Sequence, residues 1–137
     1  CFEELILHKV DLSGIILKPN MILSGTQSKE RISSEEVSNK TLECLKNSVP
    51  SDVPGIAFLS GGQSESEATE NLNLINKNNN TNFIMTYSYG RALQQSALKV
   101  WSKNIKDIEG TQKTFNHRAK MCTLAAQGKW VRELESK

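Results

Sequence analysis

The chain has 137 residues, of which 23% are charged and 37% hydrophobic, and its formal net charge is +2. This composition is typical of a globular protein that is long enough for one domain with a real core. A net charge this small, with basic and acidic residues intermixed, argues against binding to nucleic acid or to a membrane surface. No apolar run reaches the roughly 20 residues that a membrane span needs.

The cysteines indicate a reducing environment. There are three of them, Cys1, Cys44 and Cys122, and they are widely spaced, without a CxxC motif or a Cys/His ligand pattern. We therefore expect reduced intracellular thiols rather than disulfides or a zinc site.

Strands and helices alternate along the chain. Apolar runs predict strands at 14–17, 55–59 and 83–87, and apolar stripes at helical spacing predict helices at about 33–49, 64–76, 92–101 and 105–127. Short aliphatic runs of this kind are typical of strands buried on both faces of a parallel sheet. The alternation predicts an α/β fold, which is either doubly wound or a segment of a (β/α)8 barrel.

The start of the chain resembles the end of a helix. Phe2, Leu5 and Ile6 have amphipathic spacing, and the chain begins at Cys1 rather than at Met. We therefore expect this sequence to be a piece of a longer protein.

Residues that could react with or bind a ligand follow each predicted strand. Lys18 ends the first strand, Ser60-Gly61-Gly62 follows the second, and Ser88-Tyr89-Gly90-Arg91 follows the third. The carboxyl ends of parallel strands share one side of a sheet, where ligands bind. A lysine that loses hydration there can attack a carbonyl as a neutral amine, although it could instead extend into water. Glycines before a helix and an arginine at a helix start suit a phosphate.

The motifs themselves resemble those of class I fructose-bisphosphate aldolase. The stretches that carry the resemblance are Leu17-Lys18-Pro19-Asn20-Met21, Phe58-Leu59-Ser60-Gly61-Gly62-Gln63-Ser64-Glu65 and Ser88-Tyr89-Gly90-Arg91-Ala92-Leu93-Gln94. The resemblance covers nearly the whole chain and corresponds to roughly the last third of a family member. It implies that 1–137 is a single piece of a TIM barrel, strands six to eight with their helices, without an internal domain boundary.

The resemblance also implies an activity and a set of site residues. The complete enzyme would reversibly cleave fructose 1,6-bisphosphate to dihydroxyacetone phosphate and glyceraldehyde 3-phosphate, in glycolysis and gluconeogenesis. Lys18 would form the Schiff base, and the substrate phosphate would be bound by Ser60, Gly61, Gly62, Ser88, Gly90 and Arg91. No metal and no cofactor are implied, because the iminium is the electron sink. A cytoplasmic homotetramer acting on sugar phosphates is expected, and a plastid location stays open.

The chain departs from the family pattern in three respects. Ser13 stands where the family usually has an acidic residue. The acid/base carboxylates and a further lysine of the family come from earlier strands, which this sequence lacks, and the family's C-terminal tail with a functional tyrosine is missing as well. We therefore expect the isolated chain to be incomplete for activity and marginally stable or prone to aggregation. His8 and His117 have no evident partners and are interpreted as structural or solvated.

Two alternatives remain open at this stage. A different Schiff-base barrel enzyme, similar to transaldolase or deoxyribose-phosphate aldolase, would share the lysine chemistry, although the two glycine motifs argue against it. A non-catalytic remnant of a truncated gene would act at most as a phosphate-binding or interaction module.

Overall fold

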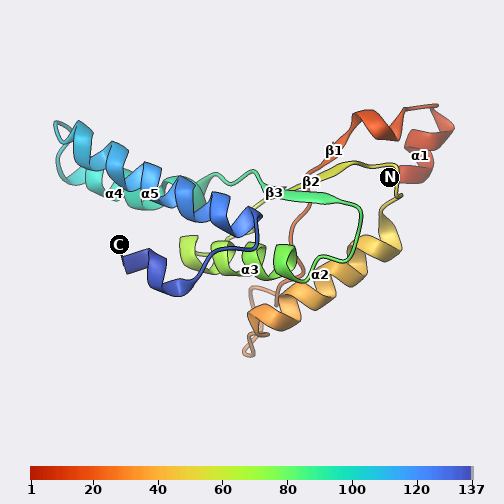
Figure 1. The fold of residues 1–137 in the computed structure, drawn as a ribbon, viewed down its shortest axis with the longest axis horizontal. Coiled ribbons are helices and arrows are strands. Elements are labelled where there is room, and N and C mark those ends of the chain that lie inside the picture. Colours follow the sequence, from red (N-terminus) through yellow and green to blue (C-terminus); the bar gives the residue numbers. More distant parts are fainter. Residues whose placement is uncertain (137) are drawn as a thin grey trace.

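The computed structural model describes residues 1–136, which form three parallel strands and their connecting helices (Figure 1). The strands lie in the order β1-β2-β3. The elements are α1 (Phe2–Leu7), the 3-10 helix η1 (Leu12–Gly14), β1 (Ile16–Leu17), α2 (Ser34–Ser48), β2 (Gly55–Phe58), α3 (Glu65–Lys77), β3 (Ile84–Tyr87), α4 (Arg91–Lys103), α5 (Ile108–Ala126) and the 3-10 helix η2 (Arg132–Ser136).

Local sequence signals set most helix ends. The Ser33 hydroxyl accepts a hydrogen bond from the Glu36 N–H at the start of α2. A capping box forms at the start of α3, where Ser64 and Glu67 exchange hydrogen bonds. α5 begins three residues later than predicted, because the Asp107 side chain caps it by accepting from the Gly110 N–H.

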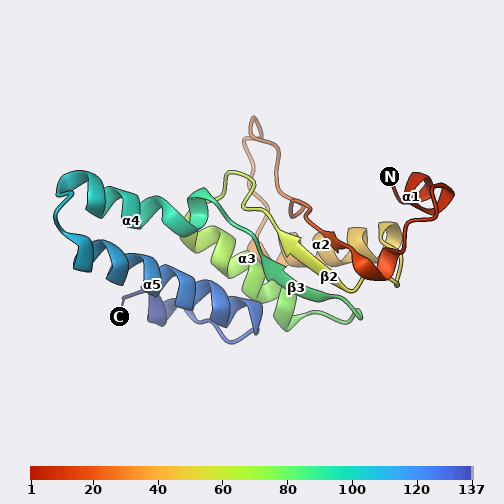
Figure 2. The same ribbon diagram turned by 90° about the horizontal axis from the view of Figure 1, so that it is seen from above.

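The helices α2, α3 and α5 pack on one face of the sheet. α3 lies between α2 and α5, and α4 and α5 form an antiparallel pair that extends beyond the strands (Figures 1 and 2). A doubly wound fold has helices on both faces, whereas a barrel carries its helices on the outside only. The predicted α/β fold with a parallel sheet is therefore confirmed, and the one-sided packing is that of a partial barrel.

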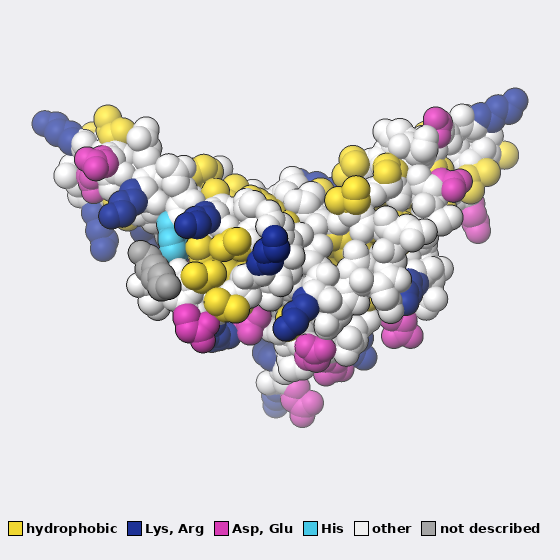
Figure 3. All heavy atoms as spheres, in the orientation of Figure 1, with side chains coloured by type: hydrophobic (Ala, Val, Ile, Leu, Met, Phe, Trp, Pro, Cys, Tyr) yellow, Lys and Arg dark blue, Asp and Glu magenta, His cyan; other side chains and the backbone are white. Residues whose placement is uncertain are grey.

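The core lies between the sheet and these helices. Ile56 and Phe58 of β2 are fully buried there, and so are Val53, Ala68, Leu72, Ile75, Cys122 and Ala125. The opposite face is open: Ile16 is 64% exposed and Ile84 is 75% exposed. Figure 3 shows the molecule hollowed along its upper edge, above the strands.

The prediction that all three strands are buried on both faces was wrong for β1 and β3. Only the central strand β2 approaches it, with Gly55, Ile56 and Phe58 buried and Ala57 half-buried. β1 and β3 are the edge strands, and among residues 1–136 no helix covers the second face. An apolar run identifies a strand but not which neighbours cover it.

The helices of residues 1–136 include none with the length and apolar character that crossing a membrane requires.

Candidate active site at the carboxyl ends of the strands

The three strand ends are joined by backbone hydrogen bonds that extend the sheet beyond its last paired residues. The Leu59 N–H donates to the Pro19 carbonyl over 3.0 Å, and the Ser88 N–H donates to the Phe58 carbonyl over 2.8 Å. The loops that contain Lys18, Ser60 and Ser88 therefore lie side by side on one rim, as the sequence predicted.

Lys18 lies on the open face of the sheet. The registers pair Leu17 with Ile56 and Ile56 with Met85, and all three of these side chains face the helices. Because side chains alternate along a strand, the next residue, Lys18, points to the other face. Ser88 is on that face too, since it follows half-buried Tyr87 and precedes buried Tyr89.

Lys18 is exposed, so of the two alternatives left open by the sequence this chain shows the one in which the side chain extends into water. Lys18 is exposed because it lies on the open face of the sheet, which no other element of residues 1–136 covers at the end of β1. The amine is placed where a ligand over the rim can meet it, and the surroundings that would exclude water are not part of this stretch of chain.

The Ser60-Gly61-Gly62 loop needs its glycines. Gly61 and Gly62 have φ angles of 57° and 84°, in the left-handed region that glycine adopts without strain. A Cβ at Gly61 would also lie 2.8 Å from the Asn20 Cγ atom and closer still to its Oδ1. The glycine loop is therefore fitted against the loop that follows Lys18.

Two buried amides hold the glycine loop, and the sequence analysis assigned them no role. Gln63 donates to the Ser60 carbonyl from its backbone N–H over 3.0 Å and from its side chain over 2.8 Å. The Asn71 side chain donates to the Gln63 side-chain oxygen over 2.6 Å. The only signal in the sequence that could have pointed to this role of Asn71 is its position beside the apolar stripe of α3.

The third strand end is fixed by Tyr89. Its hydroxyl donates to the Ala68 carbonyl of α3 over 3.0 Å, and burial raises the pKa of Tyr89, with smaller contributions from Cys122 and Tyr87. Gly90, the N-cap of α4, has a φ of −94°, and a Cβ there would meet nothing within 4 Å. Arg91 is exposed at the first position of α4, and it makes no hydrogen bond or ion pair with the other described residues.

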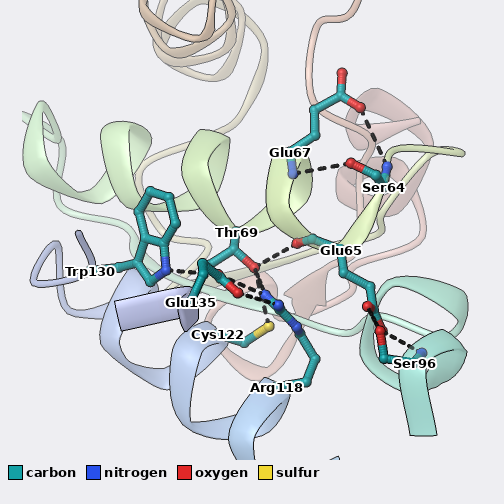
Figure 4. Close-up of polar contacts among 9 residues, drawn as sticks. All are labelled: Ser64, Glu65, Glu67, Thr69, Ser96, Arg118, Cys122, Trp130 and Glu135. Carbon is teal, nitrogen blue, oxygen red and sulfur yellow. Dashed lines mark hydrogen bonds and ion pairs between the residues drawn. The ribbon is translucent and has the colours of Figure 1, made fainter. Parts of the chain in front are cut away.

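Several positively charged groups gather at the rim. Lys18 and Arg91 carry positive charges, and the N-termini of α3 and α4 add their partial charges. The acidic side chains in the first turn of α3 are held in hydrogen bonds: Glu67 accepts from the Ser64 N–H, and Glu65 accepts from Ser96 of α4 (Figure 4). Such a surface suits an anionic ligand.

One hollow borders this region, and another lies farther along the molecule. A cleft of about 830 Å³ lies between residues 20–26 and Gly61, Gly62 and Gln63, and Lys18, Ser88 and Arg91 do not line it. A groove of about 520 Å³ lies between α4 and α5, away from the predicted site residues. Among residues 1–136, no cluster of three or more His, Cys, Asp or Glu side chains is arranged to hold a metal ion.

Comparison with known proteins decides the family. The family model described as fructose-bisphosphate aldolase class-I matches residues 1–137. The chain belongs to the class-I fructose-bisphosphate aldolase family. The resemblance seen in its motifs is thereby confirmed.

Individual aldolases agree with this assignment. The non-muscle fructose-bisphosphate aldolase of Lethenteron camtschaticum is 48% identical over 131 residues, which are 95% of this chain and 36% of that protein. Two Arabidopsis thaliana relatives, named fructose-bisphosphate aldolase 4, cytosolic, and fructose-bisphosphate aldolase 2, chloroplastic, are 44% and 46% identical. They match over 93% and 98% of this chain, and over 33% and 34% of their own lengths.

A solved structure supports the same fold. Fructose-bisphosphate aldolase from Plasmodium falciparum, in complex with TRAP and a small molecule inhibitor, superposes with a TM-score of 0.90 at 38% identity. The match covers 95% of this chain and 38% of that one. This aldolase chain therefore spans little more than a third of the proteins it matches.

Proposed function

We propose that the complete protein is a class I fructose-bisphosphate aldolase that cleaves fructose 1,6-bisphosphate reversibly to dihydroxyacetone phosphate and glyceraldehyde 3-phosphate. The observation that carries the proposal is the shared rim. An exposed lysine and two glycine loops at helix N-termini are brought together by hydrogen bonds between neighbouring strand ends. Family membership supports the choice of substrate.

Lys18 is the proposed nucleophile. Its Nζ attacks the C2 carbonyl of the sugar, water leaves, and an iminium forms. The electrons of the breaking C3–C4 bond move into this iminium, glyceraldehyde 3-phosphate departs, and protonation and hydrolysis then release dihydroxyacetone phosphate. The groups that transfer protons in these steps are proposed to come from the part of the barrel outside this chain.

The proposed anchor for the substrate phosphate is the pair of glycine loops. Backbone N–H groups of Gly61 and Gly62 and the N-terminus of α3 would bind it from one side. Ser88, Gly90 and Arg91 would bind it from the other, with the guanidinium supplying a charge-assisted contact. Ser60 completes the set, and Gln63 fixes its carbonyl.

The wider setting of this piece is also a proposal. We place residues 1–137 as one continuous piece, strands six to eight, of a TIM barrel whose full-length form is a homotetramer acting on sugar phosphates. A cytoplasmic location is proposed, supported by the relative named cytosolic, and the relative named chloroplastic keeps a plastid location open.

Reductive trapping tests this function. The full-length enzyme is incubated with dihydroxyacetone phosphate and borohydride, and the adduct is mapped by mass spectrometry. We expect one major adduct, on Lys18, that is lost in Lys18→Arg because an arginine keeps the charge but forms no Schiff base. Exposed Lys29 serves as the reference for non-specific labelling. Adducts spread evenly over surface lysines would contradict the proposal and favour a non-catalytic remnant.

A further inference from the structure

Glu65 makes a contact that its position alone does not explain. It is the first residue of α3, where an acidic side chain ordinarily stabilises its own helix end. Its carboxylate instead reaches α4: one oxygen accepts from the Ser96 backbone N–H over 2.9 Å, and the other accepts from the Ser96 hydroxyl (Figure 4). Both side chains are half-buried, so the contact is partly shielded from water.

Glu67 provides the comparison within the same helix turn. Its carboxylate accepts from the Ser64 N–H and so remains within the capping box of α3. Both glutamates start the same helix, but only Glu65 connects it to another element. The capping of α3 therefore does not depend on Glu65.

Together with a second contact, the Glu65 contact holds the start of α4 against α3. Gly90 and Arg91 lie between two residues that are tied to α3: Tyr89 donates to the Ala68 carbonyl, and Ser96 donates to Glu65. Ser96 is five residues beyond Arg91, about 7.5 Å along the helix axis. The first two turns of α4 are thus held against the helix that follows the Gly61-Gly62 loop.

The contact matters because two loops must meet one phosphate. One loop comes from the start of α3 and the other from the start of α4, so the distance between them depends on how the two helices pack. Both carboxylate oxygens of Glu65 accept hydrogen bonds from Ser96, so the side chain is directed toward α4.

We propose that Glu65 is a positioning residue that sets Arg91 and the start of α4 relative to the Gly61-Gly62 loop, so that both loops contact one phosphate. The proposal rests on the function proposed above. It gives Glu65 no contact with the substrate: Glu65 acts through Ser96.

The test compares two ligands that differ only in the phosphate. Full-length wild type and variants are trapped with borohydride and either dihydroxyacetone phosphate or unphosphorylated dihydroxyacetone, and the Lys18 adducts are quantified. For Glu65→Ala we expect the preference for the phosphorylated ligand to fall about tenfold, the scale of a lost charge-assisted hydrogen bond. Trapping of dihydroxyacetone should stay unchanged, because Lys18 itself is not disturbed.

Three further variants sharpen the comparison. Glu67→Ala is the matched control and should keep the preference. Glu65→Gln should retain most of it, since one amide oxygen still accepts from the Ser96 N–H. Ser96→Ala keeps that backbone donor and should lose part of the preference; if Glu65→Ala does not fold, Ser96→Ala decides.

The outcomes separate this proposal from the proposed function. If Glu65→Ala keeps the wild-type preference, or if both adducts fall equally, Glu65 has no positioning role and the inference is overturned. If wild type itself forms no Lys18 adduct, the proposed function fails, and the role of Glu65 fails with it.

Discussion

At the scale of single residues, the glycines of the candidate site differ in whether the backbone conformation requires glycine. Gly61 combines a φ of 57° with a Cβ position already occupied by the Asn20 side chain, whereas Gly90 has a negative φ and open space around it. The sequence shows glycine at both positions, but only the structure shows that the Gly61 backbone demands it. At Gly90 the need for glycine would come from the ligand.

Gly61→Ala should therefore destabilise the protein and weaken phosphate binding. A left-handed conformation costs a residue with a side chain on the order of 1–3 kcal/mol, and the overlap with Asn20 adds to this cost. Gly14→Ala is the control, because a Cβ there meets nothing within 4 Å. Urea unfolding measures the stability of both variants, and equal stability of the two would refute the strain at Gly61.

At the scale of elements, a buried polar network holds α5 and the chain end against α3. Arg118 of α5 donates to Thr69 of α3 over 3.0 Å and pairs with Glu135 of η2 (Figure 4). The Trp130 indole N–H donates to the same Glu135 carboxylate over 2.9 Å. The Cys122 thiol lies 3.7 Å from the Thr69 hydroxyl, at the centre of this contact.

Alkaline pH should loosen α5 from α3 through Cys122. Burial raises the pKa of this thiol above its ordinary 9.0; Thr69 and Arg118 oppose the shift, and Glu135 and Glu65 add to it. Above pH 9.0 the unfolded chain releases the proton first, so stability falls with rising pH, by at most about 1.4 kcal/mol per unit. Urea midpoints at pH 7 and pH 10 should differ less in Cys122→Ser. An equal loss in both proteins would mean that other groups, such as Tyr89, control the alkaline transition.

The elements show what the sequence could predict. The start of the helix at Ser64 and the positions of the three strand ends depend on local signals within a few residues, and both predictions were confirmed. The contacts between Gln63 and Asn71, Glu65 and Ser96, and Arg118 and Glu135 were missed. They join side chains whose meeting depends on helix packing, and polar residues at these positions look the same in sequence as solvated ones.

At the scale of the whole molecule, the open face of the sheet is the main feature. The prediction of two-sided burial failed at Ile16 and Ile84 because residues 1–136 supply no second layer. Curated aldolases such as that of Lethenteron camtschaticum match this chain over 36% of their length. We propose that the remaining strands of the barrel cover this face, and that the isolated chain, with apolar side chains exposed there, is prone to aggregation.

The central claim is that Lys18 and the two glycine loops form one site. The most direct measurement is a crystal structure of the full-length enzyme after trapping with dihydroxyacetone phosphate and borohydride. We predict continuous density from the Lys18 Nζ atom to a phosphate within hydrogen-bond distance of the Gly61 and Gly62 N–H groups and of Arg91. A phosphate bound elsewhere, or an adduct on another lysine, would contradict this account.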